Sequence, residues 1–210
     1  GRRIYDNLRK AMRFILAVHV PIAGLALLPL ILGAPLLFGP IHIAFIEMII
    51  DPVCALVFEA EEDEAGLMTR PPRAIDAPLF STATILWSMA QGIIALGAVV
   101  ALYLTAQGLP TDQTRVLVFV ALVLVIFVLV LVNRRRSPSL IGALSKHNQA
   151  LGIITLIITA LMGAVIAFPP LRGLFGFELP NAVWWTGPPL VAAAVMMSLE
   201  GIKAVQLRQV

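Results

Sequence analysis

The chain has 210 residues, of which 60% are hydrophobic and 13% are charged, and its mean hydropathy is +0.95. Soluble proteins carry about 45–50% apolar and about 25% charged residues, so this composition excludes a water-soluble globule. The formal net charge of +3 comes from short basic clusters between apolar runs, which excludes the continuous basic face of a nucleic-acid-binding protein. The single Cys54 excludes an intramolecular disulfide, and no Cys/His spacing typical of a zinc module occurs.

Six apolar runs are long enough to cross a bilayer as helices, which takes about 20 residues each. We place them at residues 14–32, 41–58, 83–107, 116–132, 150–168 and 183–199. Short connections follow the first and third runs, whereas the second and fourth are followed by longer, charged ones. The sequence therefore predicts an all-α, multi-pass protein of the cell membrane, with six transmembrane helices as three antiparallel hairpins. The lipid bilayer is its first predicted partner, and nucleic acid is not one.

The basic residues predict the orientation of these helices. Of the 15 Lys and Arg residues, only Arg115 and Arg172 fall in the segments on one side of the predicted membrane. The other 13 lie near the two termini and in the loops 59–81 and 133–149. By the positive-inside rule, both termini and these two loops are predicted to be cytoplasmic. The chain begins at Gly1, without Met or a signal peptide, so we expect a fragment of a longer protein.

The first span carries two prolines, Pro21 and Pro29, and one ionisable residue, His19. Proline lacks an amide and displaces the carbonyl four residues before it, so we expect Pro21 to break the helix and free the Ala17 carbonyl. His19 is a candidate ligand or proton carrier. The alternative is a histidine that only donates a hydrogen bond.

The second span carries two carboxylates, Glu47 and Asp51, four residues apart and therefore on one helix face. Each ionised acid near the middle of a bilayer costs about 2.5–3.5 kcal/mol unless a cation or a proton offsets it. The pair therefore predicts ion handling, with both acids as metal or cation ligands. The alternative is a protonated or hydrogen-bonded pair that only holds helices together.

Pro52 follows Asp51 directly and is expected to break this helix and free the Met48 carbonyl between the two acids. The short connection after the first span should also bring His19 to a depth comparable with Asp51. The alternative for Pro52 is a simple kink shielded by neighbouring helices. The predicted ion-binding groups are the side chains of Glu47, Asp51 and His19 and the backbone carbonyls of Met48 and Ala17.

Four other positions have expected structural roles. His42, near the outer end of the second span, is expected at the membrane interface. Cys54 lies on the face of the acids but is typical of a small buried hydrophobe. Gly163 and Ala167 form a small-xxx-small pair, which allows close helix approach.

Two strings resemble P-type cation-transporting ATPases. GRRIYDNLRKAMRF at residues 1–14 is similar to the stalk that enters their fifth membrane helix, and FIEMIIDPVCALVFEAEEDEAGLMTRPPR at residues 45–73 is similar to their sixth helix and following loop. The resemblance covers the whole chain as the last six of ten membrane helices, although residues 82–210 match by topology more than by motif. It implies that Asp51 stands at the transport-site aspartate and that the direction of transport is export from the cytoplasm.

The chain departs from calcium-pump relatives around this aspartate. Glu47 and Ile50 stand where Asn and Thr are usual, and His19 and Ile22 stand where Asn and Glu are frequent. Residues 116–132, which correspond to the eighth helix, contain no polar side chain. We therefore expect a single-cation or proton-coupled site rather than a two-calcium site. Calcium, magnesium, manganese and the proton all stay open as the transported ion.

The phosphorylated DKTG motif, the nucleotide domain and the proline-interrupted fourth helix of such pumps do not occur in these 210 residues. We therefore expect no catalytic residue and no cofactor in this segment. The implied partners are the N-terminal membrane helices and the cytoplasmic ATPase domains of the same full-length chain, which would use ATP and Mg²⁺, and the transported cation. The loop 59–73 is expected to dock on those domains. The alternative is an independent six-helix channel or secondary transporter, which should begin with Met and show two similar halves.

Overall fold

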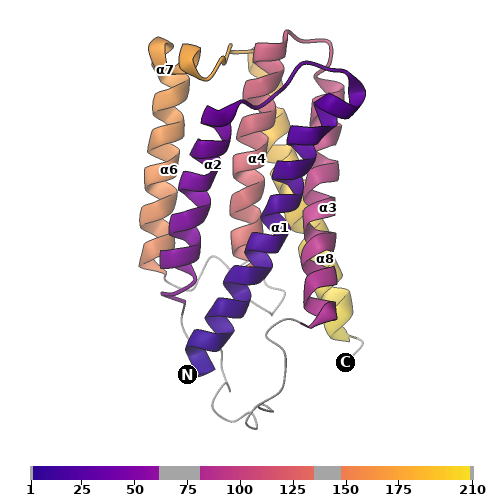
Figure 1. Ribbon diagram of the computed structural model, residues 1–210, viewed down its shortest axis with the longest axis vertical. Helices are drawn as coiled ribbons and strands as arrows, with labels where there is room; N and C mark the ends of the chain where they lie inside the picture. Colours follow the sequence, from indigo (N-terminus) through magenta and orange to yellow (C-terminus); the bar gives the residue numbers. More distant parts are fainter. Residues whose placement is uncertain (1, 62–80, 135–147, 209–210) are drawn as a thin grey trace.

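The computed structural model describes residues 2–61, 81–134 and 148–208, so most of the loop 59–73 lies outside the described residues. Every regular element in the described part is a helix, which confirms the all-α class (Figure 1). The elements are α1 (Arg2–Leu32), α2 (Pro40–Pro52), η1 (Val53–Val57), α3 (Thr82–Thr105), α4 (Thr111–Arg134), α6 (Gln149–Ala167), α7 (Pro169–Leu174), η2 (Ala182–Thr186) and α8 (Gly187–Arg208).

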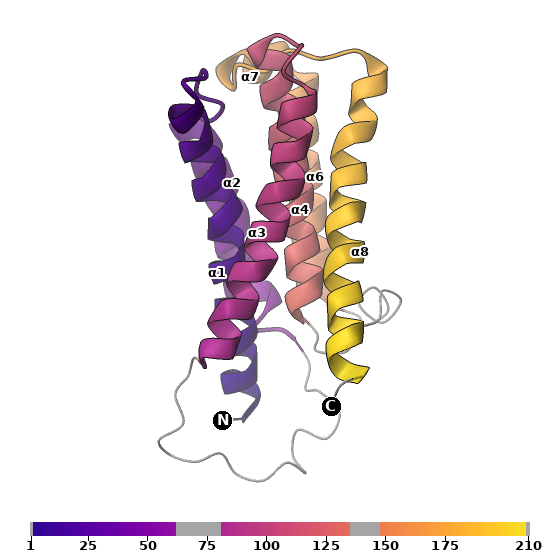
Figure 2. The same cartoon turned by 90° about the vertical axis from the view of Figure 1, so that its right-hand side faces the viewer.

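Six helical segments of the described part are long and apolar enough to cross a membrane, which confirms the predicted number. The segment of α2 and η1 together, Pro40–Val57, forms one of them, and η2 with α8 forms another. Successive spans run in opposite directions, and the start of α1 and the end of α8 lie at the same end of the bundle (Figures 1 and 2). The helix α1 joins the polar stalk and the first span in one continuous helix.

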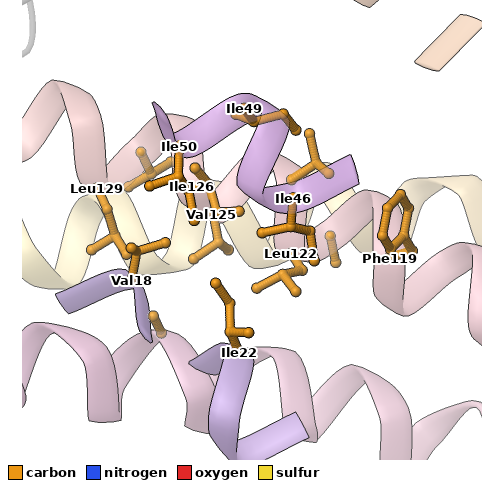
Figure 3. Packing of buried hydrophobic residues seen from close by; sticks show 14 of the residues in the cluster. Val18, Ile22, Ile46, Ile49, Ile50, Phe119, Leu122, Val125, Ile126 and Leu129 are labelled. Carbon is orange, nitrogen blue, oxygen red and sulfur yellow. The ribbon is translucent and has the colours of Figure 1, made fainter. Parts of the chain in front are cut away.

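The apolar helix α4 lies at the centre of the bundle. In its most apolar stretch 78% of the residues are buried, against at most 39% in any other span. Residues of α1 and α2 pack onto it, as Ile22, Ile46 and Leu122 illustrate in Figure 3. A helix that is surrounded by other helices is apolar on every side, which explains why residues 116–132 contain no polar side chain.

The closest helix pairs are α1 with α3 and α4 with α8, rather than the pairs that follow each other in sequence. Gly92 of α3 permits the first contact, because a Cβ atom there would lie 2.5 Å from the Val20 Cβ and 2.6 Å from the Ala17 carbonyl oxygen. Small residues let membrane helices approach in this way. At Gly163, in contrast, an added Cβ would meet nothing within 4 Å, so the expected small-residue pair makes no close contact in the described part of the chain.

The prolines act differently from the expectation. The helix α1 continues through Pro21 and Pro29, so the prediction that Pro21 breaks it is wrong. A proline removes one hydrogen bond, whereas an interruption would leave several polar backbone groups unbonded in a bilayer. At Pro52 the helix changes its hydrogen-bond pattern instead of unwinding. The α-helix ends there, and η1 continues as a π-helix in which the Phe58 amide donates to the Val53 carbonyl at 3.2 Å.

A buried ion pair joins four parts of the chain at the end of the bundle where the termini lie. Arg134 of α4 donates from Nε to Glu61 Oε2 at 2.7 Å, and only 2% and 5% of the two side chains are exposed. Asn148 donates to the same carboxylate oxygen at 3.1 Å, and Asn7 of α1 donates to the Glu61 carbonyl at 2.9 Å. Glu61 therefore holds the residues that follow η1 against α1, α4 and the start of α6.

Candidate ion-binding site

The structure brings His19 of α1 and Glu47 of α2 together, with 3.9 Å between His19 Nε2 and Glu47 Oε1. His19 Nδ1 lies 2.8 Å from the Ile15 carbonyl, which can only accept, so Nδ1 carries a proton. In the neutral imidazole, Nε2 then presents a lone pair toward the carboxylate. A separation of 3.9 Å is too long for a direct hydrogen bond. Two facing lone pairs of this kind attract a proton or a cation between them.

Asp51 lies one helical turn beyond Glu47 on the same face of α2 and is also exposed. Between the two acids stands Met48, whose carbonyl has no donor at the usual position because Pro52 has no amide. Two carboxylates and one carbonyl without its usual donor therefore fall within a single turn. Oxygen groups of this kind suit hard cations, and the imidazole of His19 adds a nitrogen ligand.

The Ala17 carbonyl lies on a different side of α1. Ala17 is fully buried, and its carbonyl oxygen faces Gly92 of α3, as the close approach at that glycine shows. The His19 side chain is 51% exposed and faces α2. The structure therefore places the Ala17 carbonyl in the contact between α1 and α3, apart from the His19 and Glu47 pair.

The helix α2 has two contrasting faces. Ile46, Ile49 and Ile50 are buried and pack toward α4 (Figure 3). Glu47, in contrast, has 41% of its side chain exposed, and Asp51 is exposed as well. Because ionised acids are costly in hydrocarbon, a face of this kind in a membrane span has to meet other protein, water, a proton or a cation.

Within the residues that the structure describes, no group of three or more His, Cys, Asp or Glu side chains could hold a metal ion. The pair of acids with His19 therefore does not form a complete coordination shell by itself. Cys54, seven residues after Glu47, is half-buried and lines a groove of about 330 Å³ between α1 and η1, together with Leu8, Ala11 and Phe58.

Three further residues have structural roles that the sequence did not reveal. His42 lies near the predicted end of its span and is only 5% exposed, so it is enclosed by protein, and its place at the membrane interface stays a prediction. Arg115 donates to the carbonyls of two separate loops, and Glu61 forms the buried ion pair described above. Only Arg115 carried a signal, since it is one of just two basic residues on its side of the predicted membrane.

Six apolar spans, with paired acids in one of them, are typical of the membrane part of a multi-pass protein. Residues 35–205 match the family described as "Cation transporting ATPase, C-terminus", and the chain belongs to this family. It is therefore a multi-pass membrane protein, as the sequence predicted.

Named relatives agree with this assignment. The chain is 25% identical over 209 residues to a calcium-transporting ATPase of Listeria monocytogenes, which covers 98% of this chain and 23% of the relative. It is 26% identical over 178 residues to a calcium-transporting ATPase of Bacillus subtilis, covering 83% of this chain and 20% of the relative. A sodium/potassium-transporting ATPase subunit alpha-4 of Homo sapiens is 38% identical over 73 residues, covering 35% of this chain and 7% of the relative. The chain thus spans about a quarter of the length of the first relatives or less.

Proposed function

We propose that this chain is the membrane half of an ATP-driven cation pump and that it supplies part of the cation site from α1 and α2. The observation that carries the proposal is the exposed face on which His19, Glu47 and Asp51 lie, in a chain of the cation-transporting ATPase family. An ionisable residue inside a membrane span is a candidate for function, and three on one face strengthen that interpretation.

The exposed acid face also supports the proposed partners. The chain spans about a quarter of its relatives' length, so the remaining length offers protein that can cover α1 and α2. We propose that N-terminal membrane helices of the same full-length chain cover this face and complete the cation's ligand shell. The cytoplasmic domains of that chain would hydrolyse ATP with Mg²⁺. The 13 basic residues near the termini and the long loops support a cytoplasmic placement for both ends of the chain.

The first ion to test is calcium, which the names of the first bacterial relatives specify for those proteins. The residues favour a single cation, because α4 offers only apolar side chains between Val116 and Val132. The facing groups of His19 and Glu47 also support a proton that exchanges with the cation. Carboxylates, an imidazole and a carbonyl can serve both purposes.

The contact between α1 and the residues after η1 supports a route by which phosphorylation would move the cation site. Phosphorylation in the cytoplasmic domains would move the stalk of α1, which carries His19 on the same helix. Asn7 of the stalk donates to the carbonyls of Glu59 and Glu61, just beyond η1. A movement of α1 would therefore pull on the end of the helix that carries Asp51 and change the separation between the ligands. Such a change alters cation affinity because the two arrangements bind the ion differently.

The decisive experiment measures cation-stimulated ATP hydrolysis of the full-length protein in lipid vesicles. We expect Asp51→Asn to abolish stimulation while phosphorylation by inorganic phosphate, which this family performs without the transported ion, persists. Glu47→Gln should shift the cation concentration for half-maximal stimulation or its pH dependence. Glu59→Gln is the matched control, because Glu59 is an exposed acid just beyond η1 and should leave both properties unchanged. If Asp51→Asn and Glu47→Gln both transport with normal ion and pH dependence, the two acids only hold helices together.

A further inference from the structure

His42 is enclosed at the end of the bundle opposite the termini. It belongs to the first turn of α2 and is only 5% exposed. Four phenylalanine rings surround its imidazole, with centroid separations of 5.4–5.6 Å. They come from the loop before α2, from α4 and from the segment after α7, namely Phe38, Phe119, Phe175 and Phe177. The imidazole therefore lies where three parts of the chain meet.

Both ring nitrogens of His42 are engaged, and their partners fix its protonation. The Gly39 amide donates to Nδ1 at 3.0 Å, so Nδ1 must present a lone pair. Nε2 lies 2.9 Å from the Phe175 carbonyl, which can only accept, so Nε2 carries the proton. This pattern fits only the neutral imidazole. A second proton on Nδ1 would point one N–H at another N–H and would place a charge among aromatic rings.

Arg115 of α4 holds the same two stretches of chain. Its Nε donates to the Leu37 carbonyl at 2.7 Å, and its Nη1 donates to the Gly176 carbonyl at 2.7 Å. Leu37 and Gly176 are close in sequence to the two partners of His42. Arg115 and His42 therefore fasten the loop 33–39 and the segment 175–177 together.

The charged groups at this end of the described chain offer His42 no acid partner. Arg115, which is itself cationic, holds the same two stretches of chain. Asp112, on the same helix, is paired with Arg115. Arg172 donates to a carbonyl of α6, and Glu178 is exposed. No acid in the described part of the chain forms an ion pair with His42.

We propose that His42 acts as an acid-released latch. In its neutral form the imidazole fastens the loop 33–39 and the segment 175–177 to α2 and α4. When the imidazole is protonated, these hydrogen bonds break and the two stretches of chain are released. The stability that the latch provides is present while the imidazole is neutral and is lost as the pH falls. Release would free the first turn of α2, and Glu47 lies little more than one turn further along the same helix. The latch depends on neither cation binding nor ATP hydrolysis.

Hydrogen exchange of the full-length protein in lipid nanodiscs tests the latch at about pH 7.5 and about pH 5, on either side of the ordinary imidazole titration. Rates are corrected for the intrinsic pH dependence of exchange. The informative amides are Gly39, which donates to the imidazole, and Glu178, which donates to the Asp112 carbonyl at 3.3 Å. We expect both to exchange more than about tenfold faster at the lower pH, since the loss of a buried hydrogen bond together with a buried charge exceeds 1.4 kcal/mol. Amides of α3 should keep their protection.

The variant His42→Gln should show no such acid response, because glutamine can accept and donate but does not titrate in this range. If that variant fails to fold, the double variant His19→Gln/His147→Gln decides, because it leaves His42 as the single histidine of these 210 residues. It should retain the full response. Equal protection at both pH values in the parent, an unchanged response in His42→Gln, or its loss in the double variant would overturn the proposal.

Discussion

Replacing Arg134 by methionine should strongly destabilise the protein, because it leaves Glu61 buried without its cation. Only 2% of the Arg134 side chain and 5% of the Glu61 side chain are exposed, so solvent screens the pair little. Removing one partner of a buried ion pair costs about 3–5 kcal/mol. A loss of this size lowers the unfolding temperature, by fewer degrees per kcal/mol the larger the protein is. Asn148 remains as a donor to the carboxylate but carries no charge.

The measurement is the temperature at which half of the full-length protein leaves the monodisperse peak in size-exclusion chromatography. The double variant Glu61→Met/Arg134→Met removes both charges and should recover most of the loss, because apolar residues of similar size often replace a buried pair without cost. Glu59→Met, at an exposed position nearby, should change the temperature little. A single variant as stable as the parent, or a double variant as unstable as the single one, would refute the assignment of Glu61 and Arg134 as a buried, mutually compensating pair.

Two further predictions concern helix packing and orientation. Gly92→Ala should destabilise the protein by about 1–3 kcal/mol, because the new Cβ would overlap α1, whereas Gly97→Ala, where nothing lies within 4 Å, should be neutral; thermal unfolding compares the two. In a Cys54→Ala background, a cysteine at Thr111 should react with an impermeant thiol reagent in intact cells, whereas one at Ser145 should not; the reverse pattern would contradict a cytoplasmic placement of the termini.

The number and position of the spans were predictable because the thickness of a bilayer fixes the length of an apolar helix. The partners of these helices were not predictable in the same way. The contact between α1 and α3 depends on Gly92, which has no side chain where Val20 approaches. Neither local sequence contains a pattern that predicts this contact. The pair Gly163 and Ala167 had the more recognisable spacing, yet open space surrounds Gly163.

The candidate site was predictable in part, because its acids lie close together in the sequence. The spacing of Glu47 and Asp51 placed them on one face, and the short loop after α1 favoured the approach of His19, which lies 3.9 Å from Glu47. Their role as ion ligands stays a prediction. In contrast, Glu61 belongs to an acidic run typical of a solvated loop, and its partner Arg134 lies 73 residues away. Contacts of such separation are set by packing rather than by local pattern.

The difference in polarity between α2 and α4 also has a consequence for how the chain enters the membrane during synthesis. The stretch of α4 from Val116 to Val132 consists of apolar residues, each of which favours insertion by a few tenths of a kcal/mol, so this helix can enter the bilayer unaided. Glu47 and Asp51 oppose insertion of α2 by about 2.5–3.5 kcal/mol each when ionised. Covering by α4 does not remove this cost, because α4 packs against the opposite face of α2, with Ile46, Ile49 and Ile50. During insertion the two acids therefore have to carry protons or stay beside parts of the chain that emerged earlier, such as α1.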